Sequence, residues 1–557
     1  MLAFSFRKIM RIVLAALNSK FIHSSLSPWC IKAGIDYFCK ESHEVIVAEA
    51  TVNSDIDEFC DYILSLKPDT IAFSCYIWSI EKILPLAKSL KESIGCIIAL
   101  GGPEVEYRQE EVLRNNHYID YVISGEGEWS FSSFIDGLLS GSFENAEGIS
   151  YLFNDSFVQI NAKAHNDTPP SPYTDEYFEK LNGRIAYIEA GRGCPYRCSY
   201  CLSGRLSGVR YFDENQVFEN IIRLSHSGTR TIKFIDRTFN ADARKADRIL
   251  LFIRDNYRKS INGNVCFHFE IAADILKEST IDILSTMPAG LCQLETGIQS
   301  FNDKTLKAIN RKTDLYKLCE NVKRLVSFRN MHIHTDLIAG LPFEDIKSFK
   351  ISFNKAFSLK SDMLQLGFLK LLYGTEMRRN DAGYSVFYNK TPPYEIISNE
   401  WLSENDIQSL KYCEDALERL YNSGRFLFTL DYLFNVAGLD PFDTFCEFGR
   451  SFDFRKIGLS DFTERIWLFF KDKSDEEKLR ECILSDINSL PVNIRVPDCI
   501  KQYDPLYKRL KKKYTELLHK NVRIVILHSE NKVMVIPTDK TDRITGRYSA
   551  EYYYIEE

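Results

Sequence analysis

Apolar residues in the first 150 positions form five short runs, each long enough for one buried strand. They lie at residues 11–17, 44–48, 70–74, 96–100 and 121–124. A stretch with amphipathic-helix spacing follows each run, at residues 27–39, 56–66, 80–93, 108–116 and 130–139. This alternation predicts a doubly wound, Rossmann-like parallel sheet, whose ligand site lies beyond the carboxyl ends of the strands. Met10, directly before the first run, is a candidate native start.

The loops at those strand ends carry the candidate binding residues of this region. They contain Asn18, His23, Ser74, Gly101, Gly102, Gly125 and Glu126. Paired glycines allow the backbone to come close to a bulky ligand. The Gly-x-Gly-x-x-Gly fingerprint of dinucleotide sites does not follow the first strand. The fold alone does not choose a ligand.

The alternation of strands and helices resumes after residue 180. Six strand-like runs lie at 184–189, 231–235, 265–271, 291–299, 332–338 and 363–372. Helical stretches separate them at 215–225, 241–254, 279–286, 303–310 with 316–329, and 348–358. Beyond residue 375 the strand signal fades, so we expect a mostly helical C-terminal region that ends in a hairpin at 523–537.

These patterns predict three domains, at residues 10–145, 181–375 and 376–557. The segment 146–180 contains the proline cluster Thr-Pro-Pro-Ser-Pro-Tyr, which favours an extended linker. The fold class is therefore α/β for the first two domains and mostly helical for the third.

Composition excludes several classes of partner. The 557 residues include 70 Lys and Arg against 77 Asp and Glu, a net charge of −7, so no attraction to nucleic acid or membranes is expected. No apolar run approaches the ~18 residues of a membrane span. Fifteen cysteines in so long a chain do not fit a small secreted disulfide scaffold. We expect a cytoplasmic protein.

Three of the cysteines are clustered, as Cys194-x3-Cys198-x2-Cys201, and the other twelve are scattered as small buried residues usually are. Random placement of 15 cysteines predicts about 0.01 copies of this spacing. Zinc normally takes four closed ligands, and no fourth Cys or His lies nearby. Iron–sulfur cubes also usually take four cysteines. Three thiolates therefore indicate a cube with one open iron, with a zinc loop as the alternative.

This spacing, with Tyr200 before the last cysteine, resembles the signature of radical S-adenosylmethionine (radical SAM) enzymes. The resemblance implies a [4Fe–4S] cluster on the three cysteines, with S-adenosylmethionine on the open iron. It also implies a six-strand partial (β/α)6 barrel over residues 181–375. An external reductant such as flavodoxin or ferredoxin would supply the electron.

Three further stretches resemble the family: residues 234–240, 295–300 and 336–342. By this resemblance, S-adenosylmethionine would contact Tyr200, Asp236, Asn240, Glu270, Glu295, Gln299, Ser300 and Asp336. The simpler alternative for each carboxylate is that it caps a neighbouring helix. No catalytic residue beyond the cluster ligands can be named.

A doubly wound domain directly before such a barrel resembles the cobalamin-binding domain of B12-dependent radical SAM proteins. The resemblance implies that the strand-end residues named above, from Asn18 to Glu126, hold cobalamin. The Asp-x-His-x-x-Gly motif that supplies a lower axial histidine is absent. The lower ligand is therefore His23, a water or none, and loss of the corrinoid stays an alternative. The whole arrangement resembles a subgroup with a distinctive C-terminal domain.

The expected function is cobalamin-dependent methyl transfer to an unactivated carbon of a small molecule or peptide. One alternative is a radical cyclisation or rearrangement without methyl transfer. Another, outside the enzymes, is an iron–sulfur or corrinoid carrier.

The cluster assignment can be tested on one ligand. We expect Cys198→Ala to abolish the visible absorbance of the anaerobically reconstituted protein, because two thiolates do not hold the cube. Replacing a scattered cysteine such as Cys319 should leave the spectrum intact. Retention of the absorbance in the Cys198 variant would contradict the assignment.

Overall fold

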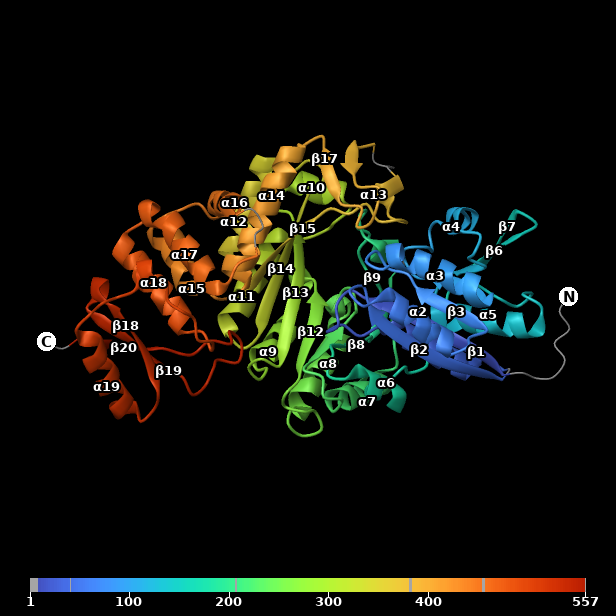
Figure 1. Ribbon diagram of the computed structural model, residues 1–557, viewed down its shortest axis with the longest axis horizontal. Coiled ribbons are helices and arrows are strands. Elements are labelled where there is room, and N and C mark those ends of the chain that lie inside the picture. Colours follow the sequence, from blue (N-terminus) through green and yellow to red (C-terminus); the bar gives the residue numbers. More distant parts are fainter. Residues whose placement is uncertain (1–8, 41, 206–207, 380–382, 453–455, 556–557) are drawn as a thin grey trace. The chain divides into compact units, whose positions relative to one another are not determined.

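The computed structural model describes residues 9–40, 42–205, 208–379, 383–452 and 456–555 (Figure 1). The chain divides into two compact units. The first comprises Met1–Glu270 and Lys370–Ile396, and the second comprises Ile271–Leu369 and Ile397–Glu557.

A seven-stranded sheet in the order β2-β1-β3-β4-β5-β6-β7 dominates the start of the first unit. Its strands are β1 Met10–Asn18, β2 His43–Thr51, β3 Thr70–Ser74, β4 Ile97–Gly101, β5 Tyr121–Ile123, β6 Ile149–Phe153 and β7 Ser156–Ile160. The first five are parallel, which confirms the doubly wound fold. The antiparallel hairpin β6–β7 continues this sheet into the segment that the sequence predicts as a linker.

Helices cover both faces of this sheet. They are α1 Ser27–Phe38, α2 Ile56–Ser65, α3 Ile80–Ile94, α4 Gln109–Asn115 and α5 Gly127–Ser140. Alternate residues of β1 enter different cores: Val13 packs with α2, α3 and α4, whereas Leu14 packs with α1 and α5. A strand buried on both faces reads as a continuous apolar run, as in the sequence.

The rest of the first unit contains the cysteine loop together with short strands and helices. The parallel strands are β8 Ala186–Ile188, β11 Thr231–Phe234 and β12 Cys266–Ile271. Strands β9 Gly191–Cys194 and β10 Gly208–Tyr211 form a separate antiparallel pair, which the sequence did not reveal. The helices are α6 Asp175–Leu181, α7 Glu214–Ser225, α8 Ala243–Asn256 and α13 Glu376–Arg379.

The second unit begins with three parallel strands, β13 Cys292–Gln299, β14 His332–Ala339 and β15 Met363–Phe368. Helices α9 Glu278–Ser285, α10 Asp303–Ala308, α11 Leu315–Phe328 and α12 Ile346–Ser358 connect or flank them. One six-stranded sheet has the order β15-β14-β13-β12-β11-β8, which is the strand number and order expected of the partial barrel.

The C-terminal region is mostly helical, as predicted. Its main helices are α14 Glu404–Leu417, α15 Leu427–Asp431, α16 Pro441–Phe452, α17 Leu459–Phe470, α18 Glu476–Asn488 and α19 Leu506–Leu518. The predicted hairpin is present as β18 Val522–Leu527 and β19 Lys532–Pro537, with a third strand, β20 Glu551–Tyr554. A short pair, β16 Val386–Tyr388 and β17 Ile396–Asn399, precedes the helices. Across the described ranges, no helix combines the length and apolar character needed to cross a bilayer.

Helix α1 lies unusually close to α5. A Cβ added at Gly34 would be 2.5 Å from the Cα of Glu128 and 2.4 Å from its carbonyl oxygen. Only glycine permits this approach, because no atom of a real side chain can come so near to backbone.

We therefore expect Gly34→Ala to lower the free energy of unfolding by about 1–3 kcal/mol through overpacking. Denaturant unfolding followed by circular dichroism measures this change. Gly458→Ala is the control, since a Cβ there meets open space and only the poorer N-cap preference of alanine applies, about 0.5–1 kcal/mol. Equal effects of both substitutions would contradict the close-packing argument.

Candidate functional site

The three clustered cysteines lie on a loop shaped by a tight strand pair. Cys194 ends β9, and Cys198 and Cys201 lie between β9 and the short helix Leu202–Arg205. A Cβ on Gly193, whose φ is +108°, would lie 2.2 Å from the carbonyl oxygen of Gly208, so glycine is required for this pairing. All fifteen cysteines lie in the described ranges, and no disulfide joins any of them. Three unlinked thiols within eight residues fit the ligand set of an open cube.

A cavity of about 660 Å³ lies at the carboxyl ends of β1, β3, β4 and β5. All seven residues predicted to hold cobalamin line it: Asn18, His23, Ser74, Gly101, Gly102, Gly125 and Glu126. Its inner wall is apolar and is formed by the side chains of Leu14, Ile31, Ala72, Ile123 and Phe131. The volume falls within the range of about 300–1,000 Å³ common for small-molecule sites. The structure brings the predicted residues together, and their contact with a corrinoid stays a prediction.

Several polar residues of this cavity are already hydrogen-bonded to neighbours. Asn18 donates to Glu49 over 2.9 Å, and the Ser27 hydroxyl donates to that of Ser74 over 3.0 Å. His23 Nδ1 lies 2.6 Å from the hydroxyl of Tyr187. Burial lowers the pKa of His23, so the ring is neutral near pH 7 and keeps one nitrogen able to accept.

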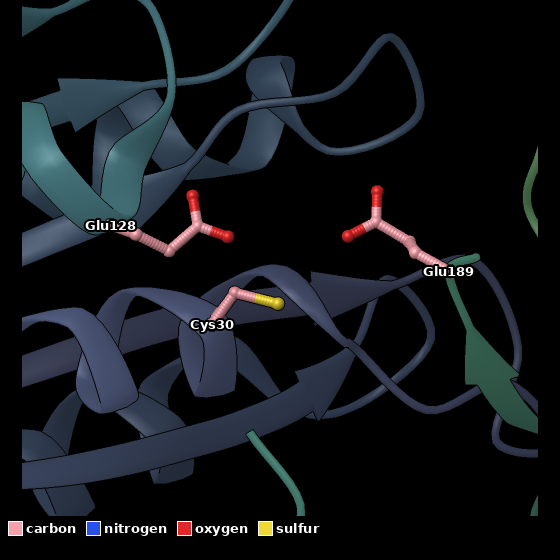
Figure 2. A group of neighbouring side chains, drawn as sticks. All are labelled: Cys30, Glu128 and Glu189. Carbon is pink, nitrogen blue, oxygen red and sulfur yellow. The ribbon is translucent and has the colours of Figure 1, made fainter. Parts of the chain in front are cut away.

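A second group in this cavity was missed by sequence reasoning. Cys30 of α1, Glu128 of α5 and Glu189, which follows β8, point toward one another (Figure 2). Their ligand atoms all lie within 4.8 Å of one another. Cys30 carried no signal, because it is one of the twelve scattered cysteines. Burial raises the pKa of its thiol well above the usual range, so the thiol is protonated.

Arg192 forms ion pairs with the carboxylates of this group. Its guanidinium lies 2.7 Å from Glu189 and also pairs with Glu128 and Glu126. Arg210 pairs with Glu126 over 2.7 Å. Burial opposes the charge on Arg192, but Glu189 and Glu128 outweigh it and raise the arginine pKa. With the thiol protonated and both carboxylates paired, the group is an ion-pair network and does not fit a metal site.

The residues predicted for S-adenosylmethionine fall into two sets, one in each unit. In the first unit, Asp236 is buried, accepts a hydrogen bond from the Ala190 amide over 2.9 Å, and has its pKa raised to about 8 by burial. Asn240 is also buried. Glu270 lies 3.3 Å from Lys233, and Tyr200 directly precedes the last cysteine of the loop.

The second set lies on β13 and β14. Glu295 is the register partner of His334, whose Nε2 lies 2.9 Å from Asp336 and whose Nδ1 lies 4.0 Å from Glu295. At the end of β13, Gln299 has a φ of +71°, and the hydroxyl of Ser300 donates to Glu344 over 2.7 Å. The roles of both sets in binding S-adenosylmethionine stay predictions.

Family models match three parts of the chain. Residues 16–135 match the B12 binding domain, and residues 188–356 match the radical SAM superfamily. The chain therefore contains a B12-binding domain and a radical SAM domain. Residues 382–534 match a third model, described as a protein of unknown function (DUF4080). These domains identify the cofactors of this radical SAM protein as a [4Fe–4S] cluster, S-adenosylmethionine and cobalamin, and confirm that expectation.

Curated relatives include methyltransferases. The chain is 27% identical over 319 residues to the 2-(S-pantetheinyl)-carbapenam-3-carboxylate methyltransferase of Streptantibioticus cattleyicolor, covering 51% of this chain and 44% of the relative. It is 27% identical over 333 residues to the cobalamin-dependent radical SAM methyltransferase TokK of Streptomyces tokunonensis, covering 53% and 45%. The matched region thus spans less than half the length of either relative. The anaerobic magnesium-protoporphyrin IX monomethyl ester cyclase of Rubrivivax gelatinosus is 22% identical over 58% of this chain and 60% of its own length.

Two solved structures share the fold. One is the radical S-adenosylmethionine methyltransferase TsrM from Kitasatospora setae with cobalamin and a [4Fe–4S] cluster, at a TM-score of 0.58 and 15% identity, covering 70% of this chain and 82% of TsrM. The other is the apo form of OxsB, a cobalamin-dependent S-adenosylmethionine radical enzyme, at a TM-score of 0.60 and 14% identity, covering 92% of this chain and 81% of OxsB. At these identities they confirm the fold class alone.

The ion-pair network can be tested by unpairing it. We expect Arg192→Gln to lower the free energy of unfolding by about 3–5 kcal/mol, because Glu128, whose side chain is 3% exposed, is left as an uncompensated buried charge. The double variant Arg192→Gln, Glu128→Gln should be more stable than this single variant. Denaturant unfolding gives both values. A double variant no more stable than the single one would contradict the charge argument.

Proposed function

We propose that this protein is a radical SAM enzyme that uses cobalamin to methylate an unactivated carbon of a small molecule or peptide. The radical SAM and B12-binding domains support the enzyme class. The curated relatives in Streptantibioticus and Streptomyces are methyltransferases, which supports methyl transfer.

One observation carries the proposal: the segment that leads into the cysteine loop lines the same cavity as the B12-binding sheet. Glu189 and Arg192 line the same space as the strand-end loops of the sheet. Arg192 lies only two residues before Cys194, the first proposed cluster ligand. A corrinoid in this cavity would therefore lie close to the loop that holds the cluster.

When bound, the cluster and S-adenosylmethionine supply a carbon-centred radical that removes hydrogen, and cobalamin supplies the methyl group. The chain itself binds and orients these cofactors and shields them from water. Cys194, Cys198 and Cys201 would hold the cluster, and the apolar wall from Leu14 to Phe131 would exclude water from the corrinoid. The ion pairs of Arg192 with Glu128 and Glu189, which line the cavity, join its walls.

Radical ring closure is the second candidate. It is favoured by the similarity to the Rubrivivax cyclase, which extends over 58% of this chain. The two candidates differ in the fate of the methyl group: only methyl transfer moves a labelled methyl from S-adenosylmethionine to a product. An external one-electron reductant of the flavodoxin or ferredoxin class would serve either reaction.

Anaerobic reconstitution with iron, sulfide and cobalamin tests the proposal. We expect the reduced protein to convert S-adenosylmethionine to 5′-deoxyadenosine, measured by liquid chromatography, and to retain about one cobalamin per chain by absorbance. An intact cluster that releases no 5′-deoxyadenosine would instead make the protein a carrier.

A cavity variant separates the two cofactor sites. Ser74→Phe places a ring in the cavity and should lower bound cobalamin at least about tenfold, while 5′-deoxyadenosine release continues. Ser89→Phe, at an exposed position on α3 of the same domain, is the control and should retain cobalamin. Full occupancy in the Ser74 variant would contradict the assignment of the cavity.

A further inference from the structure

A second cavity, of about 1030 Å³, lies entirely within the second unit, and the proposed chemistry does not use it. One side is formed by the turns that precede β14 and β15, with Arg329 and Lys360. Residues 421–435 of the C-terminal helical region and residues 542–552 line the other sides. The volume is close to the upper limit of about 1,000 Å³ for small-molecule sites.

This cavity lies at the amino ends of the strands. Arg329 comes before β14, and Lys360 comes before β15. The predicted S-adenosylmethionine residues Gln299 and Ser300 lie at the other end, where β13 finishes. β13 and β14 are parallel neighbours of eight residues each, so the two ends are about 26 Å apart. A molecule in this cavity is therefore a ligand other than that cofactor.

A buried ion pair fixes two walls of the cavity. Arg547 and Asp486 pair over 2.9 Å, with side chains 7% and 0% exposed. Asp486 also accepts from the amides of Phe428 over 3.0 Å and Thr429 over 2.8 Å, and Arg547 donates to the carbonyl of Gly424 over 2.7 Å. These hydrogen bonds satisfy the buried charges. The segment between β19 and β20 is thus joined to the start of α15, and the cavity is preformed.

Two π-helical turns contribute to the same lining. They lie at Glu418–Asn422 and Tyr432–Val436, and the cavity is lined by Tyr421 from the first and Phe434 from the second. A π-helical turn is a rare interruption of an α-helix and is frequent at functional sites. Two such turns at one preformed cavity indicate a binding site rather than a packing gap.

Aromatic side chains supply most of the apolar surface of this cavity. They are Phe357, Tyr421, Phe428, Phe434, Tyr548 and Tyr552. The rings of Phe357 and Phe434 meet edge to face, with centroids 5.2 Å apart. Such rings bind a planar or apolar body through large, rigid contact areas.

The cations of the lining differ in how far they are compensated. Arg547 is held by Asp486. Lys360 lies 4.0 Å from Asp431, and both side chains are about two-thirds exposed, so this pair contributes little and can exchange for a ligand. Arg329 makes no ion pair or side-chain hydrogen bond with any residue that the structure describes.

The carboxylates of the lining are bonded within their own segments. Asp362 accepts from the amide of Ile333 over 2.8 Å. Asp542 accepts from the amides of Ile544 over 3.0 Å and Thr545 over 2.7 Å. Arg329 therefore keeps its charge available to a ligand that enters the cavity.

We infer that this cavity binds an organic anion, a carboxylate or phosphate ester with an aromatic body. The anionic group lies at Arg329 and Lys360, and the body packs against the aromatic wall around Phe357 and Phe434. The inference goes beyond the proposed function, because the site needs neither the cluster nor cobalamin.

The test uses the full-length protein, reconstituted with the cluster and with cobalamin so that the first cavity is filled. The probes are 1-naphthoate, 1-naphthyl phosphate and the neutral 1-naphthylmethanol, titrated by isothermal calorimetry. We expect at least one anion to bind about tenfold more tightly than the neutral probe, because a charge-assisted contact to Arg329 is added. The tighter anion tells a carboxylate ligand from a phosphate.

Arg329→Gln tests the anion contact at an exposed position, where folding is not affected. We expect the dissociation constant of the tighter anion to rise about tenfold and that of 1-naphthylmethanol to stay within about twofold. Lys323→Gln is the matched control, because it removes a cation of the same helix region that does not line the cavity. Both dissociation constants should be unchanged in this control.

Ser358→Trp tests the location by filling the cavity from the end of α12, and should abolish binding of all three probes. Ser327→Trp is its control on α11. Each serine hydroxyl donates to the carbonyl three residues earlier, over 2.7 Å for Ser358 and 2.6 Å for Ser327, but Ser327 does not line the cavity. Binding should persist in the Ser327 variant.

Three results would overturn the inference. One is a wild-type protein that binds neither anion. Another is anion binding that survives Ser358→Trp, since the probe then lies elsewhere. The third is equal affinity for the anions and 1-naphthylmethanol with no effect of Arg329→Gln, which would make the cavity an apolar site. None of these results depends on whether the protein cleaves S-adenosylmethionine, so failure of the proposed function stays distinguishable.

Discussion

The pairing of Arg192 with three carboxylates is the interaction on which the site depends. Glu126 and Glu128 come from the end of the doubly wound sheet, and Glu189 comes from the strand that leads to the cysteine loop. An unpaired charge in a wall of the cavity would lower the stability of the fold, because burial removes its hydration. Together they allow two regions, about sixty residues apart in sequence, to line one space.

Buried carboxylates are stabilised in two different ways. In the first, the guanidinium of Arg192 compensates the carboxylates through direct ion pairs. In the second, Glu344 accepts hydrogen bonds from the hydroxyls of Ser300 and Ser352. The oxygens of these two hydroxyls accept in turn from backbone amides. The ion pairs join segments that are distant in sequence, whereas the serine hydrogen bonds orient the loop that follows β13.

Much of the fold could be predicted, because long strands buried on both faces leave continuous apolar runs and the covering helices leave amphipathic spacing. The pairs β9–β10 and β6–β7 could not, since they are short, glycine-containing or half-exposed. Among the candidate site residues, all seven strand-end positions line one cavity because parallel strands end at one edge of the sheet. Cys30 was missed because a single cysteine in a helix carries no pattern.

The sequence alone predicted the cluster ligands, because three thiols at fixed spacing on one loop need no distant partner. It also determined the order of the domains, since periodicity is a local property. Only the tertiary structure decided which polar groups lie opposite each other: that Arg192 joins two segments, and that Glu344 accepts hydrogen bonds from Ser300 after β13 and Ser352 of α12. The contacts of Arg192 with Glu126 and of Glu344 with Ser300 join residues 66 and 44 positions apart, and such pairing is set by packing rather than by local pattern.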